Sequence, residues 1–349
     1  MHIKYICFPK NPNLNHCAES FDIALKSNGN SNNNECINVI HHLDNVNFFK
    51  LIVMMINLPS SDKMSLFLFA IQFKYLVLNI ILRIFSKIFN KDLQVYYLMH
   101  EPRYEKGRIN PVKAYIVYYY HLLIGYLADK IFLPSDEALL KAKTFIASHK
   151  LYQVNLTFAS VPKQELEKNL SRLKFDWENL KTFSLLGTSS QDKNPQGFLS
   201  FADMLNKVYA DKSQFIRAGR DSNIHVNYDD ELIIRFPGYM SASAKKFLLG
   251  LTHFVVIPYS FSTQSGVIAE ALSYGKLLIV NDIPAFSHLK ELQFVFVIDF
   301  NDEKSILKLV DEIFMMNVNE YESRYYQSLK YFQENHSESY LAQKLLDVL

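Results

Sequence analysis

The sequence is poor in glycine and cysteine and carries almost no net charge. Its 349 residues include ten glycines, well below an average of about 7%, three cysteines, and a formal charge of +2 at pH 7. Three cysteines without metal-ligand spacing indicate a reducing compartment rather than a disulfide scaffold. The balanced charge argues against a nucleic-acid-binding protein, which would carry a concentrated basic face. No P-loop or G-x-G-x-x-G pattern occurs, so a nucleotide triphosphatase or an ordinary dinucleotide oxidoreductase has no support.

The chain has the composition of an ordinary enzyme. It is 49% hydrophobic and long enough for two domains of typical size. Its first residues lack the apolar core of a signal peptide, so we expect a cytoplasmic protein. Expected strands alternate with segments of helical length, which predicts an α/β fold with mainly parallel sheets.

The few glycines gather in one part of the chain. Seven of the ten lie between residues 187 and 275. Expected strands at 182–186, 214–218 and 233–236 end at or beside Gly187, Gly219 and Gly238. Loops at the carboxyl ends of parallel strands form the ligand crevice of a doubly wound sheet.

The most informative stretch is residues 258–280, PYSFSTQSGVIAEALSYGKLLIV. We expect a strand before it, a polar turn, a helix from Ser265 to Gly275, and a strand from Leu277. The first N–H groups of a helix have no intrahelical acceptor and suit a phosphate, and Gly266 lets the backbone approach it. Glu270, about one turn further on, can reach sugar hydroxyls beside that phosphate. The alternative is one more strand–turn–helix–strand unit with a solvated Glu270.

This stretch resembles the donor-binding signature of retaining GT-B glycosyltransferases, especially glycosyltransferase family 4. Glu270 matches the second of that family's two glutamates, which holds the donor ribose, whereas Ser262 replaces the first. Residues 185–201, 214–220 and 234–260 are similar to the preceding family segments, in the same order. The resemblance implies a GT-B fold with two Rossmann-like doubly wound domains facing a central cleft. It also implies retention of anomeric configuration and no metal or other cofactor.

The resemblance also implies a set of site residues. Lys193 takes the place of the lysine that pairs with the donor diphosphate, and Thr188 replaces an arginine. A cation there would stabilise the leaving group; otherwise Lys193 is a solvated surface charge. The residues expected to bind the donor are Gly187, Thr188, Lys193, Gly219, Arg220, Gly238, Tyr239, Met240, Thr263, Gln264, Ser265, Gly266, Val267 and Glu270.

The N-terminal half is expected to bind the acceptor. His100 and Glu101 lie at the carboxyl end of an expected strand, and in related enzymes a histidine near this place contacts the donor sugar. We expect a phosphorylated acceptor to be bound by Glu101, Arg103 and Arg108. The alternative is a capped strand-end histidine and a solvated basic loop. The expected catalytic residues are His100, Lys193 and Glu270.

We expect an acceptor-side domain at residues 1–162, a nucleotide-sugar domain at 163–330, and a helix at 331–349 that packs back toward the first domain. The apolar segment Met64–Phe89 has three interpretations: a buried helix, a helix on a membrane surface, or a span. Lys74 near its middle disfavours a span. A strand is expected at Lys50–Ile56 and a helix at Pro111–Leu127.

The sequence therefore predicts a cytoplasmic hexosyltransferase, with peripheral contact at the inner face of the membrane left open. It would move a sugar from a nucleotide-sugar donor to a saccharide or lipid-linked acceptor in surface polysaccharide assembly. Two alternatives stay open: a nucleotide-sugar epimerase or hydrolase of the same fold, and a non-catalytic GT-B-like partner protein.

Overall fold

The computed structural model divides the chain into two compact units. Unit 1 consists of Met1–Ala159 and Ser337–Leu349, and unit 2 of Ser160–His336. The structure describes residues 4–8, 20–21, 23–24, 37–41, 48–59, 62–68, 73–99, 111–221, 226, 228–229, 231–262 and 265–348.

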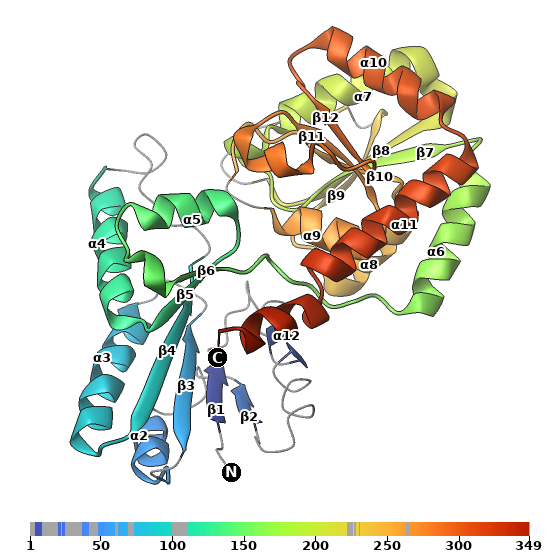
Figure 1. The fold of residues 1–349 in the computed structure, drawn as a ribbon. Coiled ribbons are helices and arrows are strands. Elements are labelled where there is room, and N and C mark those ends of the chain that lie inside the picture. Colours follow the sequence, from blue (N-terminus) through green and yellow to red (C-terminus); the bar gives the residue numbers. More distant parts are fainter. Residues whose placement is uncertain are drawn as a thin grey trace. The chain divides into compact units, whose positions relative to one another are not determined.

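Unit 1 is built on a six-stranded parallel sheet with strand order β2-β1-β3-β4-β5-β6 (Figure 1). Its strands are β1 (Lys4–Phe8), β2 (Ile37–His41), β3 (Lys63–Leu68), β4 (Asp92–Leu98), β5 (Lys130–Leu133) and β6 (Leu151–Gln153). Its helices are α2 (Phe48–Ile56), α3 (Phe73–Ile88), α4 (Pro111–Leu127), α5 (Asp136–Lys143), the short η2 (Ser148–Lys150) and α12 (Glu338–Leu346).

The sheet of unit 1 is covered on both faces. Successive side chains of a strand point to opposite faces, and in β3 Leu66 joins one hydrophobic core whereas Phe67 joins the other. The first core contains side chains from α2, α3, α4 and α5. The second contains Phe21 and, from α12, Leu341 and Leu345. A segment more than 300 residues along the chain thus completes a core that begins near residue 20.

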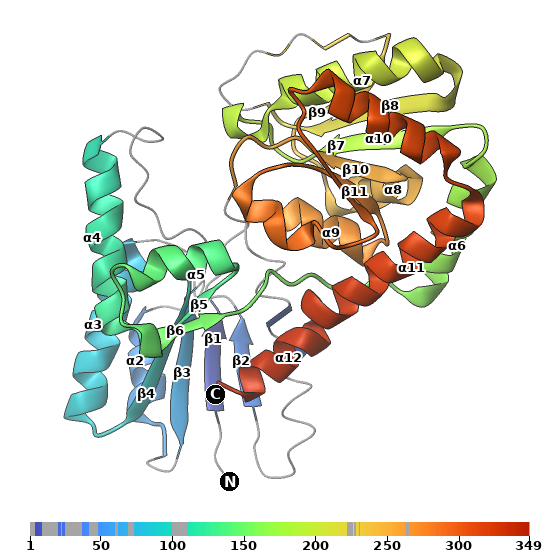
Figure 2. The same cartoon turned by 45° about the horizontal axis from the view of Figure 1, so that its top comes forward.

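Unit 2 contains a second parallel sheet, with strand order β12-β11-β10-β7-β8-β9 (Figure 2). Its strands are β7 (Lys181–Leu186), β8 (Ser213–Gly219), β9 (Ile233–Pro237), β10 (Phe254–Ile257), β11 (Leu277–Asn281) and β12 (Val295–Ile298). Its helices are α6 (Lys163–Asp176), η3 (Gln191–Lys193), α7 (Pro195–Tyr209), η4 (Ala210–Lys212), α8 (Ala242–Leu251), α9 (Gly266–Ser273), η5 (Pro284–Leu289), α10 (Glu303–Met315) and α11 (Val318–Asn335).

The order of the strands in unit 2 fixes where a ligand would bind. From β7 the chain adds β8 and β9 on one side and then β10, β11 and β12 on the other. The order reverses between β7 and β10, and in open α/β sheets ligands bind outside the carboxyl ends of the strands at that switch point. The predicted α/β fold with two doubly wound sheets is confirmed.

Two sequence predictions are wrong in unit 1. Lys50–Ile56 belongs to helix α2 and is not a strand. A short apolar run has no periodicity that separates a strand from a buried helix, but Leu51 and Met55, four residues apart, are both buried, as one face of a helix requires. Met64–Phe89 is not one helix, because it contains strand β3 and then helix α3. Among the described residues, no helix combines the length and hydropathy needed to cross a bilayer.

Candidate functional site

The switch point of unit 2 is framed by the loops that follow β7 and β10. Strand β7 is followed directly by Gly187, whose φ of 93° lies in a region that favours glycine. The Gly187 N–H donates to the Ala218 carbonyl over 2.9 Å. A Cβ added to Gly187 would come within 3.4 Å of the Val267 side chain, at the start of α9. The structure therefore brings together Gly187 and Val267, which are eighty residues apart in the sequence.

The two loops are joined across the switch point. The Asp192 carbonyl accepts hydrogen bonds from the Ser260 N–H over 3.0 Å and from the Ser260 hydroxyl over 3.3 Å. The Lys193 ammonium lies 3.7 Å from the centroid of the Tyr259 ring, within the range of a cation–π interaction. Tyr259 is buried, and burial raises the pKa of its hydroxyl to about 12, against a smaller lowering by the Ser265 hydroxyl. These contacts hold the charge of Lys193 at the switch point.

The start of α9 lies at the same edge of the sheet. Ser265 is the N-cap residue, in an extended conformation, and its side chain makes no capping hydrogen bond. The first N–H groups of α9, at Gly266 and Val267, therefore receive no acceptor from the Ser265 side chain. Ser262, which stands in place of the family's first glutamate, is buried. Thr263 and Gln264 lie outside the described residues.

Glu270 is held by a lysine that the sequence analysis did not select. The Lys245 Nζ on α8 lies 2.7 Å and 2.9 Å from the two carboxylate oxygens of Glu270. Both side chains are about one quarter to one third exposed, at 23% for Glu270 and 34% for Lys245. A bidentate pair of this kind fixes the carboxylate one turn into α9 while leaving part of it open to a ligand.

The buried side chain of Arg217 contacts the turns at both Gly187 and Gly219. Arg217 is 2% exposed, and it donates to the Gly187 carbonyl over 3.0 Å and to Asp221 Oδ1 over 2.8 Å. Gly219 packs so closely that an added Cβ would lie 2.0 Å from the Gly187 carbonyl oxygen. The loop after β7 therefore rests on the end of β8, and the position of each depends on the other.

The other predicted donor residues of unit 2 are more open. Thr188 and Arg220 are exposed, and Tyr239 is 88% exposed. Gly238 has a φ of 96°, and a Cβ placed on it would meet nothing within 4 Å. Met240 is half-buried, just before Ser241, whose hydroxyl caps α8 by accepting from the Ala244 N–H over 3.1 Å. This turn follows the edge strand β9, beyond β8 from the switch point.

The predicted residues of unit 1 are not part of the described structure. His100, Glu101, Arg103 and Arg108 all lie outside the described residues, so their roles stay predictions. Within the part of the chain that is described, no group of three His, Cys, Asp or Glu side chains is placed to hold a metal ion.

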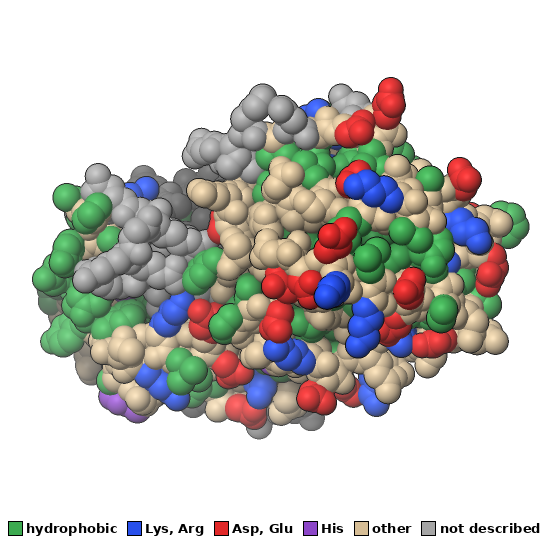
Figure 3. Space-filling view, turned by 90° about the horizontal axis from the view of Figure 1, so that it is seen from above, with side chains coloured by type: hydrophobic (Ala, Val, Ile, Leu, Met, Phe, Trp, Pro, Cys, Tyr) green, Lys and Arg blue, Asp and Glu red, His purple; other side chains and the backbone are tan. Residues whose placement is uncertain are grey.

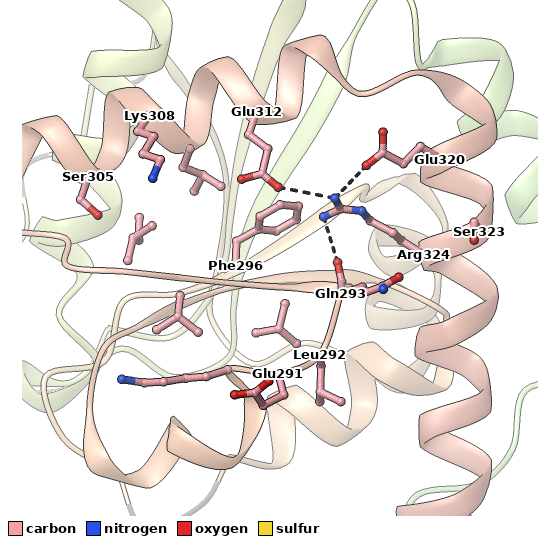
Figure 4. Close-up of a pocket in the computed structure, with 15 residues that line it drawn as sticks. Glu291, Leu292, Gln293, Phe296, Ser305, Lys308, Glu312, Glu320, Ser323 and Arg324 are labelled. Atoms are coloured by element: carbon pink, nitrogen blue, oxygen red, sulfur yellow. Dashed lines mark hydrogen bonds and ion pairs between the residues drawn. The ribbon is translucent and has the colours of Figure 1, made fainter.

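Unit 2 also has a cavity of about 730 Å³ away from the switch point, beside edge strand β12 (Figure 4). Its central charge is Arg324, which pairs with Glu320 over 2.8 Å and Glu312 over 3.5 Å. The same guanidinium donates to the Gln293 carbonyl over 2.9 Å and lies 5.0 Å from the Phe296 ring centroid. Because Arg324 is already paired with Glu312 and Glu320, we describe this cavity as a junction of α10, α11 and β12.

Comparison with known proteins identifies the fold. No family model and no curated protein matches the sequence. Among solved structures, HepE of Anabaena in complex with UDP is similar with a TM-score of 0.65 and 12% identity, covering 99% of each chain. Sucrose-phosphate synthase of Thermosynechococcus elongatus has a TM-score of 0.62 and 7% identity over 100% of this chain and 98% of that one. The N-terminal domain of Candida albicans trehalose-6-phosphate phosphatase has a TM-score of 0.65 and 10% identity, over 99% of this chain and 96% of that one.

At these identities the similarity establishes the fold alone, and that fold is GT-B, with two doubly wound α/β domains. The fold prediction is therefore confirmed, whereas membership of glycosyltransferase family 4 stays a prediction.

Sequence reasoning missed Lys245 and Tyr259. Tyr259 lies two residues after the buried strand β10, a position from which an aromatic ring can cover the next loop. Lys245 lies in the first turns of a helix whose preceding loop was already a candidate. Pairing it with Glu270 required knowing that α8 and α9 lie side by side, which no local pattern indicates.

Proposed function

We propose that the protein is a glycosyltransferase that moves a hexose from a nucleotide-sugar donor to a saccharide or lipid-linked acceptor. The reaction would serve surface polysaccharide assembly, with retention of configuration and without a metal. In this proposal Lys193 and the start of α9 hold the diphosphate, and Glu270 accepts hydrogen bonds from the ribose. The single observation that carries it is the convergence of a fixed cation, an uncapped helix start and a held carboxylate at one switch point.

Electrostatics supports this assignment of roles. A leaving nucleoside diphosphate gains negative charge as the glycosidic bond breaks, and a positioned cation together with helix N–H groups stabilises that charge. Solved structures of the same fold include HepE of Anabaena in complex with UDP-glucose and with UDP and glucose. For the present chain, a uridine nucleotide is the first donor to test.

The overall test is a panel of nucleotide sugars screened for thermal stabilisation, followed by product analysis with and without acceptor sugars. Ligands that prefer the folded state raise the melting temperature. Transfer only when acceptor is present supports the proposal. Hydrolysis or epimerisation of the donor without an acceptor would favour a nucleotide-sugar hydrolase or epimerase. The absence of donor binding would favour a non-catalytic partner protein.

Removing the charge at Lys193 should weaken nucleotide diphosphate binding. We expect Lys193→Met to raise the Kd for UDP about tenfold to a hundredfold, the range for a lost charge-assisted hydrogen bond. The affinity for uridine, which has no phosphate, should change little. Isothermal titration with both ligands measures the difference, with the exposed Lys304→Met as the matched control. Equal losses for UDP and uridine would contradict a diphosphate role.

Removing the carboxylate of Glu270 should abolish recognition of the ribose hydroxyls. We expect Glu270→Ala to bind UDP about tenfold less tightly than wild type, while binding of 2′-deoxy-UDP changes less. The exposed Glu303→Ala on α10 is the matched control. If the preference for UDP over the deoxynucleotide survives in Glu270→Ala, the ribose assignment is wrong.

A further inference from the structure

Helix α4 of unit 1 has an apolar face that the fold leaves in solvent. One stripe of exposed side chains runs along it at intervals of four and three residues: Val112, Ile116, Tyr119, Leu123 and Tyr126. Ile116 is 64% exposed and Tyr126 is 80% exposed. Ala114, His121, Ile124 and Gly125 are buried on the side that faces the core. A helix that is apolar all round is normally buried in protein or in lipid, and α4 is covered on one side only.

The neighbouring helix α3 extends this surface. Ile80, Ile84 and Ile88 recur every four residues and are exposed. Helices α3 and α4 pack against each other in the same layer, next to α2 (Figures 1 and 2). Figure 3 shows hydrophobic side chains gathered at the left edge of the molecule, where Figure 1 places α4. We call these two exposed rows the α3–α4 face, and contiguous apolar surface of this kind marks an interaction site.

The charges on these helices are of one sign. Helices α2, α3 and α4 contain no Asp or Glu, although the chain has 35 acidic residues. Lys87, in the last turn of α3, and Lys113, in the first turn of α4, are both exposed. A seam that pairs with another protein helix usually carries charges of both signs along its flanks. An apolar face on helices whose formal charges are all basic instead complements an anionic lipid surface.

The aromatic side chains agree with a lipid partner. Tyr115, Tyr119 and Tyr126 are exposed on α4. A tyrosine ring has an apolar body and a polar tip, and such rings are enriched where hydrocarbon meets lipid headgroups. Since no described helix can span a bilayer, the contact suited to α4 is one parallel to the membrane surface.

We propose that unit 1 docks on an anionic lipid bilayer through the α3–α4 face. Helix α4 lies in the headgroup region with its exposed stripe toward the acyl chains, and Lys87 and Lys113 face the anionic headgroups. This docking goes beyond the proposed sugar transfer and does not depend on it, because the surface uses no residue of the switch point. It would bring the chain to an acceptor carried by lipid.

The experiment is co-flotation of the full chain with vesicles at about 0.1 M salt. One set is pure phosphatidylcholine and the other contains roughly one third phosphatidylglycerol. We expect binding to the anionic vesicles only. The double variant Ile116→Ser/Leu123→Ser should lower the bound fraction at least about fivefold. Phe175→Ser/Met315→Ser, which removes two even more exposed apolar side chains from unit 2, should bind like wild type.

Two outcomes would overturn the docking proposal. One is wild-type protein that fails to float with the anionic vesicles, or floats equally well after the α4 substitutions. The other is a wild-type dimer that the α4 variant converts to a monomer in light scattering, since the face would then join two copies. The melting temperature of each variant without ligand reports its folding, and its shift with UDP reports the donor site. Lipid binding and nucleotide binding can therefore fail separately.

Discussion

Replacing Gly219 by alanine should destabilise unit 2 by more than about 3 kcal/mol and abolish nucleotide binding. The φ of Gly219 is 130°, a region that residues with a side chain rarely adopt. An added Cβ would also lie 2.0 Å from the carbonyl oxygen of Gly187. That oxygen is backbone and is already held by Arg217, so relief requires moving the loop that carries Lys193. Urea unfolding and UDP titration would measure the two losses.

Gly238→Ala is the matched control for this prediction. Its φ of 96° imposes a comparable backbone strain, but no atom lies within 4 Å of the added Cβ. We expect a cost of about 1–2 kcal/mol from strain alone. If both variants are destabilised equally, close packing of the loops after β7 and β8 is not the reason that position 219 requires glycine.

The second large effect is a gain in stability from removing a buried lysine. Lys276 is fully buried, and its Nζ makes no hydrogen bond within the described residues. Burial lowers the pKa of Lys276 from 10.5 to about 7. The amine therefore loses its proton in the folded state at a pH about 3.5 units lower than in the unfolded chain. The unfolded state binds more protons across that interval, so stability rises as the pH rises from about 7 toward 10.5.

Lys276→Met should therefore raise the free energy of unfolding by about 3–5 kcal/mol at pH 7. The advantage over wild type should shrink steadily as the pH rises toward 10.5, because the lysine of the unfolded chain then also begins to lose its proton, and burying the neutral amine costs less. Chemical denaturation of both proteins at several pH values in this range measures it, with the exposed Lys304→Met as control. An advantage that does not vary with pH would mean that Lys276 keeps its proton in the folded protein across this range, as it does in the unfolded chain.

The sequence predicts element boundaries correctly where a proline, a glycine or a capping side chain marks them. The helix predicted at Pro111–Leu127 has the observed bounds, because proline suits the first position of a helix. The strand predicted from Leu277 begins at that residue, and the helix before it ends near Gly275, whose φ of 67° favours glycine. A local signal of the same kind is Ser135, which caps α5 by accepting from the Ala138 N–H.

Sequence reasoning failed where only long-range contacts decide the outcome. Residues 50–56 and 64–68 are both short apolar runs, yet the first is part of a helix and the second part of a strand. Their identity depends on which neighbours bury them, and an apolar run does not encode its neighbours. The same limit applies to the site. Glu270 was selectable from its helix, whereas its partner Lys245 belongs to another helix twenty-five residues earlier.

The path of the chain through unit 1 has a consequence for folding during synthesis. Helix α12 supplies Leu341 and Leu345 to a core whose other members include Phe21, Phe67 and Phe132. All of unit 2 is translated before that helix leaves the ribosome. Domains usually fold as units in the order in which they emerge, but here the later unit is complete first. The apolar surface of nascent unit 1 stays uncovered until then, so its aggregation and its dependence on chaperones should be greatest just before α12 emerges.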